Sequence, residues 1–363
     1  MKKSLLFVGS FPKKDLKIYG GNLIDCEILL NSSLPKKVDL ILVDSTQISN
    51  PAPNIVFRLL LSFIRMIKYI YTFEKNQPDA TLIFTSSGIG IYEKGLMAWY
   101  SYLRKTDPFL FPRGDLLSYF KRHGKLSFLH KLVFYPSKKI LCQGSSWQSL
   151  VVKGLNRDVR FAPVIPNWTA RDELLKIGAQ KSYQMKNKKK LIYVGWIVKE
   201  KGIEELLIAI NSLRDNNNLL FDFIGGGAYL EEAKKFVNEN NLNDKVKFLG
   251  WRPPSFTWVK LSESDIFIFP SWKEGFPNAI VEAMASGLCV ITTPVGNIPN
   301  FIKHEENGII IGLKDSSQIK NSILNIINDP EKLKKLSKNS HEFAAKYFNV
   351  ENAVTNLIRE LEL

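Results

Sequence analysis

The sequence is poor in the residues that mark secreted and metal-binding proteins. Its 363 residues include only three cysteines, which lie far apart without a C-x-x-C pair, and four histidines. Three isolated cysteines fit neither a disulfide framework nor a zinc site, and they indicate a protein of the reducing cytoplasm. No uninterrupted apolar run reaches the ~18 residues needed to span a bilayer. The short apolar segment 5–11 predicts a first β-strand, because Lys13 and Lys14 follow it at once, which is not typical of a signal peptide.

Negative charge is scarce in the first half of the chain. Residues 1–180 contain 26 Lys and Arg against 13 Asp and Glu, whereas residues 181–363 contain 24 against 22. Most of the net charge of +15 therefore belongs to the N-terminal half. Such a field favours anionic partners, such as acidic lipid head groups, phosphorylated substrates or nucleic acid. Nucleic acid is not expected, because no recognised binding motif accompanies the charge.

Short apolar runs rich in β-branched and aromatic residues alternate with helical patterns along the whole chain. Six such runs in each half, for example LLFVGSF, ATLIFTSS, VRFAPVIPN, KKLIYVGW and DIFIFPS, predict buried strands of parallel sheets. We therefore expect an α/β protein with two Rossmann-like, doubly wound domains that face each other across a cleft. The predicted parts are an N-terminal domain over 1–168, a linker over 169–188, a C-terminal domain over 189–345, and a last helix over about 346–363 that packs back on the first domain.

The segment VFRLLLSFIRMIKYIYTF, residues 56–73, predicts an amphipathic helix of unusual composition. Its polar residues recur every three or four positions and would form one basic stripe, while the other faces are apolar. One interpretation is a crossover helix buried against the sheet. The other is an interfacial helix on anionic lipid. The two are compatible, because a crossover helix can expose one end.

The segment EGFPNAIVEAMASG, residues 274–287, predicts an anion site at a helix N-terminus. It follows the predicted strand DIFIFPS, and Asn278 is suited to cap the helix, with Pro277 in the first turn. The backbone amides of Phe276, Asn278 and Ala279 would then point at a ligand and, together with the helix dipole, favour negative charge.

Two glutamates flank this turn in different surroundings. Glu282 interrupts an otherwise apolar run, residues 279–285, where an unpaired carboxylate would be costly. A carboxylate accepts two hydroxyl hydrogen bonds well, and the vicinal hydroxyls of a ribose have that geometry. Glu274 lies on the preceding loop and would face the next part of such a ligand. The alternatives are an exposed helix glutamate at 282 and an ordinary loop glutamate at 274.

The stretch PSWKEGFPNAIVEAMASGLCVI resembles the E-x7-E signature of the family 4 retaining glycosyltransferases, which have the GT-B fold. Further segments are similar to other elements of that family: YGGN, PFLFPRGDLL, VIPNWT, YVGWIVKEKGIEELLIAI, FIGGGAYLEEA, VGNIPNFI and NGIII. The resemblance spans most of the chain and is more specific in its C-terminal half. It implies transfer of a sugar from a nucleotide-sugar donor, with retention of configuration at the anomeric carbon.

The resemblance also implies roles for individual residues. Glu274 would bind the donor sugar, Glu282 the ribose, and Lys201 would neutralise the diphosphate leaving group. The other donor-binding positions are Gly21, Trp196, Arg252, Gly275, Phe276, Asn278 and Ala279. Fixed cations and amides aimed at the diphosphate lower the barrier as negative charge grows there. Because the sequence has no D-x-D triplet, we expect no metal and no cofactor beyond the donor itself.

The chain departs from the family pattern at two places. Trp196 stands where the family normally has an arginine, so a cation expected at the diphosphate is missing; Lys199, Lys273 or Arg252 could replace it. On the acceptor side, a family histidine is replaced by the segment Arg113-Gly114-Asp115. Arg113 could hold a phosphorylated acceptor and Asp115 could take the acceptor's proton. The alternative is a solvated turn. Gly20 is a further acceptor-side candidate, because the Gly20-Gly21 loop would let the backbone approach phosphate and acceptor.

These observations predict a cytoplasmic glycosyltransferase, peripheral at the inner face of the membrane. It would move a sugar, with UDP-sugar as the preferred donor, to a glycan or lipid-linked saccharide during synthesis of a surface polysaccharide such as lipopolysaccharide. A GT-B nucleotide-sugar epimerase and a non-catalytic nucleotide-sugar-binding homologue are the alternatives. An oxidoreductase has weak support, because GGGAYLEE lacks the full G-x-G-x-x-G spacing.

Overall fold

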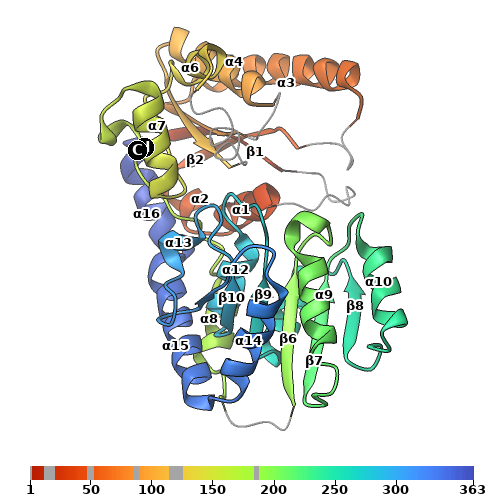
Figure 1. Cartoon of the computed structure of the whole chain (residues 1–363). Helices are drawn as coiled ribbons and strands as arrows, with labels where there is room; N and C mark the ends of the chain where they lie inside the picture. Colours follow the sequence, from red (N-terminus) through yellow and green to blue (C-terminus); the bar gives the residue numbers. More distant parts are fainter. Residues whose placement is uncertain (1, 12–20, 47–52, 86–89, 114–125, 184–187) are drawn as a thin grey trace. The chain divides into compact units, whose positions relative to one another are not determined.

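Two parallel sheets organise the chain, each in its own unit (Figure 1). The structure is a computed structural model that describes residues 2–11, 21–46, 53–85, 90–113, 126–183 and 188–363. Residues Met1–Thr169 and Val350–Leu363 form the N-terminal unit, and Ala170–Asn349 form the C-terminal unit. The predicted α/β fold with two doubly wound sheets is confirmed.

The N-terminal unit has a five-stranded sheet in the order β2-β1-β3-β4-β5, and all neighbouring strands are parallel. Its strands are β1 (Ser4–Gly9), β2 (Asp39–Asp44), β3 (Ala80–Thr85), β4 (Asp107–Pro112) and β5 (Lys139–Ile140). One face packs against α3 (Ile55–Asn76), α4 (Gly90–Leu103), α6 (Phe128–Phe134) and α7 (Ser145–Leu155). The other packs against α1 (Gly21–Leu30), α2 (Leu34–Lys37) and α16 (Val350–Leu361).

One strand predicted for the first half does not form. The run VRFAPVIPN contains the 3₁₀ helix η1 (Val159–Phe161) and then a single bridge between Cys142 and Val164. Pro163 and Pro166 lack the amide protons that a central strand would need, which explains why pairing stops at one bridge.

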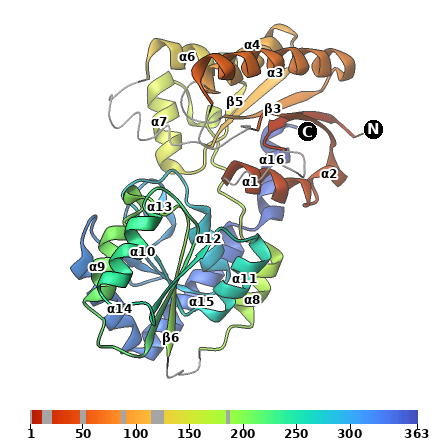
Figure 2. The ribbon, with the colours of Figure 1, turned by 90° about the vertical axis from the view of Figure 1, so that its right-hand side faces the viewer.

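The C-terminal unit has a six-stranded parallel sheet in the order β11-β10-β9-β6-β7-β8. Its strands are β6 (Lys189–Val194), β7 (Leu219–Ile224), β8 (Val246–Gly250), β9 (Ile266–Phe269), β10 (Cys289–Thr292) and β11 (Ile309–Ile310). Figure 2 shows α9 (Ile203–Asn211), α10 (Leu230–Glu239) and α14 (Ser316–Ile327) on one face. On the other lie α8 (Asp172–Ala179), α11 (Pro254–Glu263), α12 (Asn278–Ala285) and α15 (Pro330–Tyr347). The short η2 (Lys199–Lys201) and α13 (Ile298–Phe301) lie in loops that follow strands.

The segment predicted as a linker, 169–188, carries helix α8 instead. Leu174 of α8 is buried, and the Cα of Gly178 approaches Ala285 of α12 so closely that a Cβ there would lie 2.2 Å from the Ala285 carbonyl oxygen. The helix is therefore part of the C-terminal core. The exposed side of α8 makes this stretch polar. For that reason the amphipathic pattern of the helix was not recognised in the sequence.

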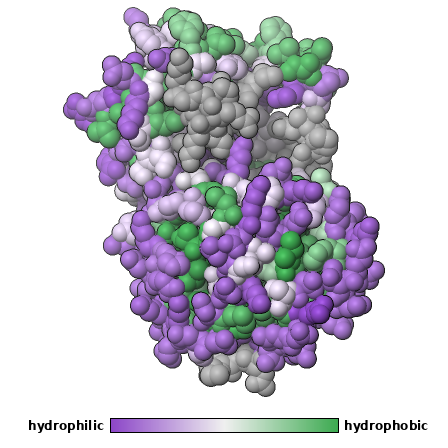
Figure 3. All heavy atoms as spheres, viewed as in Figure 1, coloured by the Kyte–Doolittle hydropathy of each residue, from purple (hydrophilic) through white to green (hydrophobic). Residues whose placement is uncertain are grey.

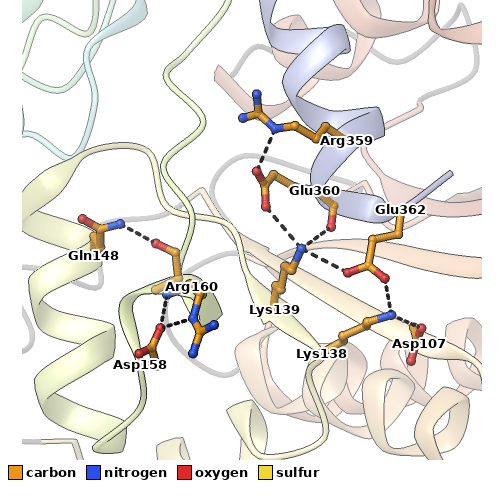
Figure 4. A network of polar contacts seen from close by, with 10 residues as sticks. Asp107, Lys138, Lys139, Gln148, Asp158, Arg160, Arg359, Glu360 and Glu362 are labelled. Atoms are coloured by element: carbon orange, nitrogen blue, oxygen red, sulfur yellow. Dashed lines mark hydrogen bonds and ion pairs between the residues drawn. The ribbon is translucent and has the colours of Figure 1, made fainter.

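The last helix belongs to the N-terminal unit. Its end is held by ion pairs to the β5 region (Figure 4): Lys138 Nζ lies 2.7 Å from Glu362 and 2.7 Å from Asp107. Lys139 Nζ lies 3.3 Å from Glu360 and 3.2 Å from Glu362. Buried Val354 and Leu357 supply the apolar contact with the sheet. The C-terminus thus returns to the unit in which the chain begins.

Helix α3 is the crossover between β2 and β3, and it is only partly buried. Tyr69 and Phe73, near its end, are buried, whereas most apolar residues of its first half are exposed. Within the described residues, no helix has both the length and the apolar character needed to cross a bilayer.

Candidate functional site

The carboxyl ends of β6, β9 and β10 carry three loops that are bonded to one another. Because these strands are adjacent and parallel, their following loops meet at one edge of the sheet. The amide of Trp272 donates to the carbonyl oxygen of Glu200 at 2.8 Å, which joins the β9 and β6 loops. The hydroxyl of Thr293 donates to the carbonyl oxygen of Ser271, which joins the β10 and β9 loops. The backbone at this edge is therefore fixed before any ligand binds.

Lys201 and Glu274, the two residues predicted to be catalytic, form an ion pair at this edge. The Nζ of Lys201 contacts Oε1 of Glu274, and the two side chains are 20% and 10% exposed. The same Nζ lies 5.4 Å from the centroid of the Phe269 ring, at the end of β9. A partly buried pair of this kind offers a cation to an anionic ligand and a carboxylate to hydroxyl groups.

Two glycines are required for this arrangement. Gly202, which follows Lys201, has φ of +72°, and a Cβ there would lie 2.1 Å from the carbonyl oxygen of Pro270. Gly296 has φ of +58°, and a Cβ there would lie 2.2 Å from the carbonyl oxygen of Glu274. Any other residue would push Lys201 and Glu274 apart or strain the backbone. The role of Gly296 was missed in the sequence, although it lies in the segment VGNIPNFI, which marks this part of the chain.

Glu282 lies one turn inside α12 and is half-buried, whereas its neighbours Val281 and Ala283 are fully buried. Helix α12 begins at Asn278, and its N-cap is Pro277, which makes no side-chain cap. The predicted capping role of Asn278 is therefore wrong by one position, because Asn278 is already the first helical residue. The helix still begins at the edge of the sheet where Glu274 lies.

The remaining residues of the 274–282 segment are positioned mainly by their backbone. The carbonyl oxygen of Gly275 accepts a hydrogen bond from the amide of Asn297 at 3.1 Å. The ring of Phe276 stacks on Phe301 at 5.1 Å, so this side chain packs into the unit. Ala279 is half-buried in the first turn of α12. The donor-binding roles of Gly275, Phe276, Asn278 and Ala279 stay predictions.

Trp196, the departure from the family pattern, forms an aromatic pair with Trp251. Their ring centroids lie 4.8 Å apart in an edge-to-face arrangement, and both side chains are partly exposed. The Trp196 carbonyl oxygen accepts a hydrogen bond from the Tyr193 hydroxyl at 2.7 Å. Burial, together with the negative charge of Glu274, raises the pKa of the Tyr193 phenol well above its ordinary value. The hydroxyl therefore remains a donor and fixes the Trp196 loop.

The cations proposed to replace the missing arginine differ in their surroundings. Arg252 donates from Nε to the Leu249 carbonyl oxygen at 2.7 Å and stacks over Phe256 at 5.0 Å. Lys199 lies over the Tyr229 ring at 5.4 Å. Lys273, the third candidate, is exposed on the loop directly before Glu274. Lys201, which was predicted to be catalytic and not a replacement, is the cation that forms an ion pair with Glu274.

In the N-terminal unit, the side chain of Arg113 is buried and bonded to other residues of the same unit. Its side chain is fully buried, forms an ion pair with Asp25, and is bonded to the Asn167 side chain. The guanidinium also lies 4.6 Å from the centroid of the Trp168 ring. As placed here, Arg113 supports the core and is not presented to an acceptor, contrary to the sequence interpretation. Its partners are distant in sequence, so no local signal could reveal the pairing.

Three other residues predicted in the N-terminal half are the donor-binding candidate Gly21 and the acceptor-side candidates Gly20 and Asp115. Gly21 is the first residue of α1. Gly20 and Asp115 lie outside the described residues. Within the described ranges there is no group of three or more His, Cys, Asp or Glu residues that could hold a metal ion.

Comparison with protein families agrees with the geometry of the C-terminal unit. Residues 179–343 match the model of the family described as glycosyl transferases group 1. An uncharacterized glycosyltransferase of Methanocaldococcus jannaschii is 28% identical over 252 residues, which cover 66% of this chain and 69% of the relative. The UDP-Gal:alpha-D-GlcNAc-diphosphoundecaprenol alpha-1,3-galactosyltransferase of Escherichia coli is 26% identical, over 58% of this chain and 52% of the relative.

Solved structures resemble the whole chain. A sucrose-phosphate synthase from Thermosynechococcus elongatus has a TM-score of 0.77 at 18% identity and covers 99% of this chain and 98% of its own. Anabaena HepE, solved in complex with UDP, has a TM-score of 0.72 at 18% identity and covers 100% of both chains. The chain thus has the GT-B fold, and its residues 179–343 match the model of the glycosyl transferases group 1 family.

Proposed function

We propose that this protein transfers a sugar from a nucleotide-sugar donor, with UDP-sugar as the preferred class, and that the anomeric configuration is retained. The observation that carries the proposal is the Lys201–Glu274 pair at the carboxyl edge of the second sheet, beside the N-terminus of α12. A cation and a helix N-terminus suit a diphosphate, and the carboxylate suits the hydroxyl groups of the sugar attached to it.

In this reaction the bond between the anomeric carbon and the diphosphate oxygen breaks, a bond from the same carbon to an acceptor hydroxyl oxygen forms, and the proton of that hydroxyl passes to the departing diphosphate. Negative charge grows on the diphosphate, where Lys201 would stabilise it. Glu274 would orient the donor sugar, and Glu282 would bind the ribose hydroxyls. The three bonded loops would keep these groups in place as the charge develops, so that little reorganisation is needed at the moment of reaction.

The acceptor we propose is a glycan or lipid-linked saccharide of surface polysaccharide synthesis, handled at the cytoplasmic face of the membrane. Support comes from the E. coli relative, whose name includes a diphosphoundecaprenol acceptor and a UDP-Gal donor. The excess of basic residues in the first half of the chain suits an acceptor that carries phosphate.

A panel of nucleotide sugars without acceptor tests this proposal and separates it from the alternatives. A transferase releases free sugar and UDP slowly from its own donor, and that donor raises the melting temperature. An epimerase instead converts the sugar while it stays attached to the nucleotide. A non-catalytic homologue is stabilised by the donor without any turnover. We expect the release to continue unchanged in EDTA, because the charge is stabilised by Lys201 and not by a metal ion.

A further inference from the structure

Most apolar residues in the first half of helix α3 are turned outward, whereas Tyr69 and Phe73 near its end are buried. The exposed residues Val56, Phe63 and Tyr71 are 74%, 64% and 66% exposed, and Leu60 and Ile67 between them are also exposed. Their spacing of three or four residues places them on one face of the helix. This face extends along the helix for about 22 Å at ~1.5 Å per residue.

Arg65 of the polar stripe of α3 faces the N-terminal unit, whereas Lys68 of the same stripe is exposed. Arg65 donates from Nε and Nη2 to the two carboxylate oxygens of Glu93 at 2.7 and 2.6 Å, and Glu93 is buried on α4. Buried Lys94 also contacts Glu93, at 3.0 Å. This arrangement fixes the rotation of α3 about its axis. The sequence left open whether the apolar faces pack against the sheet or are exposed, and the structure exposes most of them.

The exposed apolar face continues onto two neighbouring helices. Of the 24 large hydrophobic side chains that are exposed among the described residues, 16 lie on α3, α4 and the segment 128–135. They include Leu103 on α4 and Phe128 on α6, which is 78% exposed. The indole of Trp99 joins these helices by donating to the Leu132 carbonyl oxygen at 2.9 Å. Figure 3 shows hydrophobic residues gathered over this part of the N-terminal unit.

The charge around this surface is positive. Segments 55–76, 90–105 and 128–135 contain eight Lys and Arg against two glutamates. Both glutamates are already paired within the unit, Glu93 with Arg65 and Glu74 with Arg104. The exposed lysines include Lys68, Lys75 and Lys131. A partner that covers this surface must therefore offer apolar groups to the exposed hydrophobic side chains and negative charge to the surrounding lysines.

We propose that the outer faces of α3, α4 and α6 dock on a bilayer that contains anionic lipid, with the apolar side chains inserted and the lysines at the head groups. An anionic bilayer provides both the apolar acyl region and the negatively charged head groups. A second copy of this chain fits less well, because a two-fold contact through this face would oppose two basic surfaces. The proposal goes beyond the proposed function, since it depends on no residue of the donor site.

The test is co-sedimentation of the full chain with sucrose-loaded vesicles of phosphatidylcholine alone or with a phosphatidylglycerol fraction. We expect binding that requires phosphatidylglycerol and that weakens as salt rises, because the head-group attraction is screened. The double variant Phe63→Glu, Ile67→Glu should lower the partition coefficient by about tenfold or more, since charged side chains would replace inserted apolar ones. Val259→Glu, at an exposed apolar position of α11 in the other unit, is the matched control and should bind like the wild type.

Three results would overturn the proposal. One is equal sedimentation of the wild type and the double variant, and a second is no binding to anionic vesicles. The third is a dimer in analytical ultracentrifugation that the double variant dissociates, which would assign the face to self-association. Donor hydrolysis, measured on the same preparations without lipid, should be unchanged in the double variant. A failure of docking is thereby distinguished from a failure of the donor site.

Discussion

Lys201 and Glu274 are joined by an ion pair although 73 residues separate them in the chain. Each follows a different strand of the same parallel sheet, and glycines at 202 and 296 allow their loops to approach. The pair gives the site a cation and a carboxylate at one point.

Substitution Lys201→Met should reduce turnover of the donor by about 10²–10³, because it removes the fixed cation from the growing charge of the diphosphate. The fold should survive, since the side chain lies in a loop. Steady-state hydrolysis and transfer rates measure the effect, with circular dichroism as the check on folding. Lys234→Met, at an exposed lysine of α10, is the control and should leave the rate unchanged. Near-normal turnover in Lys201→Met would remove this residue from the reaction.

Substitution Glu282→Gln should weaken donor binding about tenfold or more, since hydrogen bonds to a charged group contribute ~1.5–3 kcal/mol. A 2′-deoxyribose donor gives the sharper comparison. The wild type should discriminate against it, whereas Glu282→Gln should bind both donors almost equally. Glu231→Gln, at an exposed position of α10, should discriminate like the wild type. Equal discrimination in all three proteins would show that Glu282 does not contact the ribose.

Substitution Trp196→Arg should raise kcat/KM for the donor, by about tenfold if one further cation reaches the diphosphate. The indole of Trp196 packs edge-to-face against the partly exposed Trp251 and is itself partly exposed, so an arginine can be accommodated. Trp196→Leu separates the loss of the indole from the gain of charge, and it should not raise kcat/KM. If the arginine and leucine variants have the same activity, the missing family cation is not what limits this enzyme.

Acid should destabilise the N-terminal unit through Glu93. Burial alone would raise the pKa of Glu93, but Arg65 and Lys94 outweigh it and hold this pKa below its ordinary value of 4.5. A carboxyl group with a lowered pKa in the folded state stabilises the fold above pH ~4.5, and this contribution is lost as pH falls through the folded value. Urea denaturation between pH 7 and pH 3 measures it. Glu93→Gln should be less stable at pH 7, by about 3–5 kcal/mol, because it leaves the buried Lys94 and the half-buried Arg65 without their carboxylate partner.

The pH dependence provides the control for that variant. With no carboxylate to protonate at position 93, the stability of Glu93→Gln should fall less between pH 5 and pH 3 than that of the wild type. Parallel pH profiles for the two proteins would mean that other carboxylates cause the acid transition.

Much of the fold was predictable because it depends on local patterns. Strand runs such as KKLIYVGW and DIFIFPS are continuous and apolar, which parallel sheets require on both faces. The E-x7-E segment predicted a loop and a helix that the structure contains. The approach of Lys201 to Glu274 depends on which strands are neighbours, and no local pattern specifies that. The resemblance to the family supplied it.

Long-range pairing explains where the sequence interpretation failed. Arg113 appeared available for a ligand, but its partner Asp25 lies 88 residues away and both are buried. The orientation of α3 depends on Glu93, 28 residues from Arg65. A periodic pattern shows that a helix has two kinds of face, but not which face packs against the sheet. Helix α8 was missed for a related reason, since a short helix among polar residues gives a weak periodic signal.

The stereochemistry of the first product tests the central claim most directly. Proton NMR during turnover of an α-linked UDP-sugar should show the transferred or released sugar first as the α-anomer, with UDP formed in equal amount. Lys201→Met and Glu274→Ala should both abolish this signal. A β-anomer appearing first, or an altered sugar still attached to UDP, would contradict retaining transfer at the Lys201–Glu274 site.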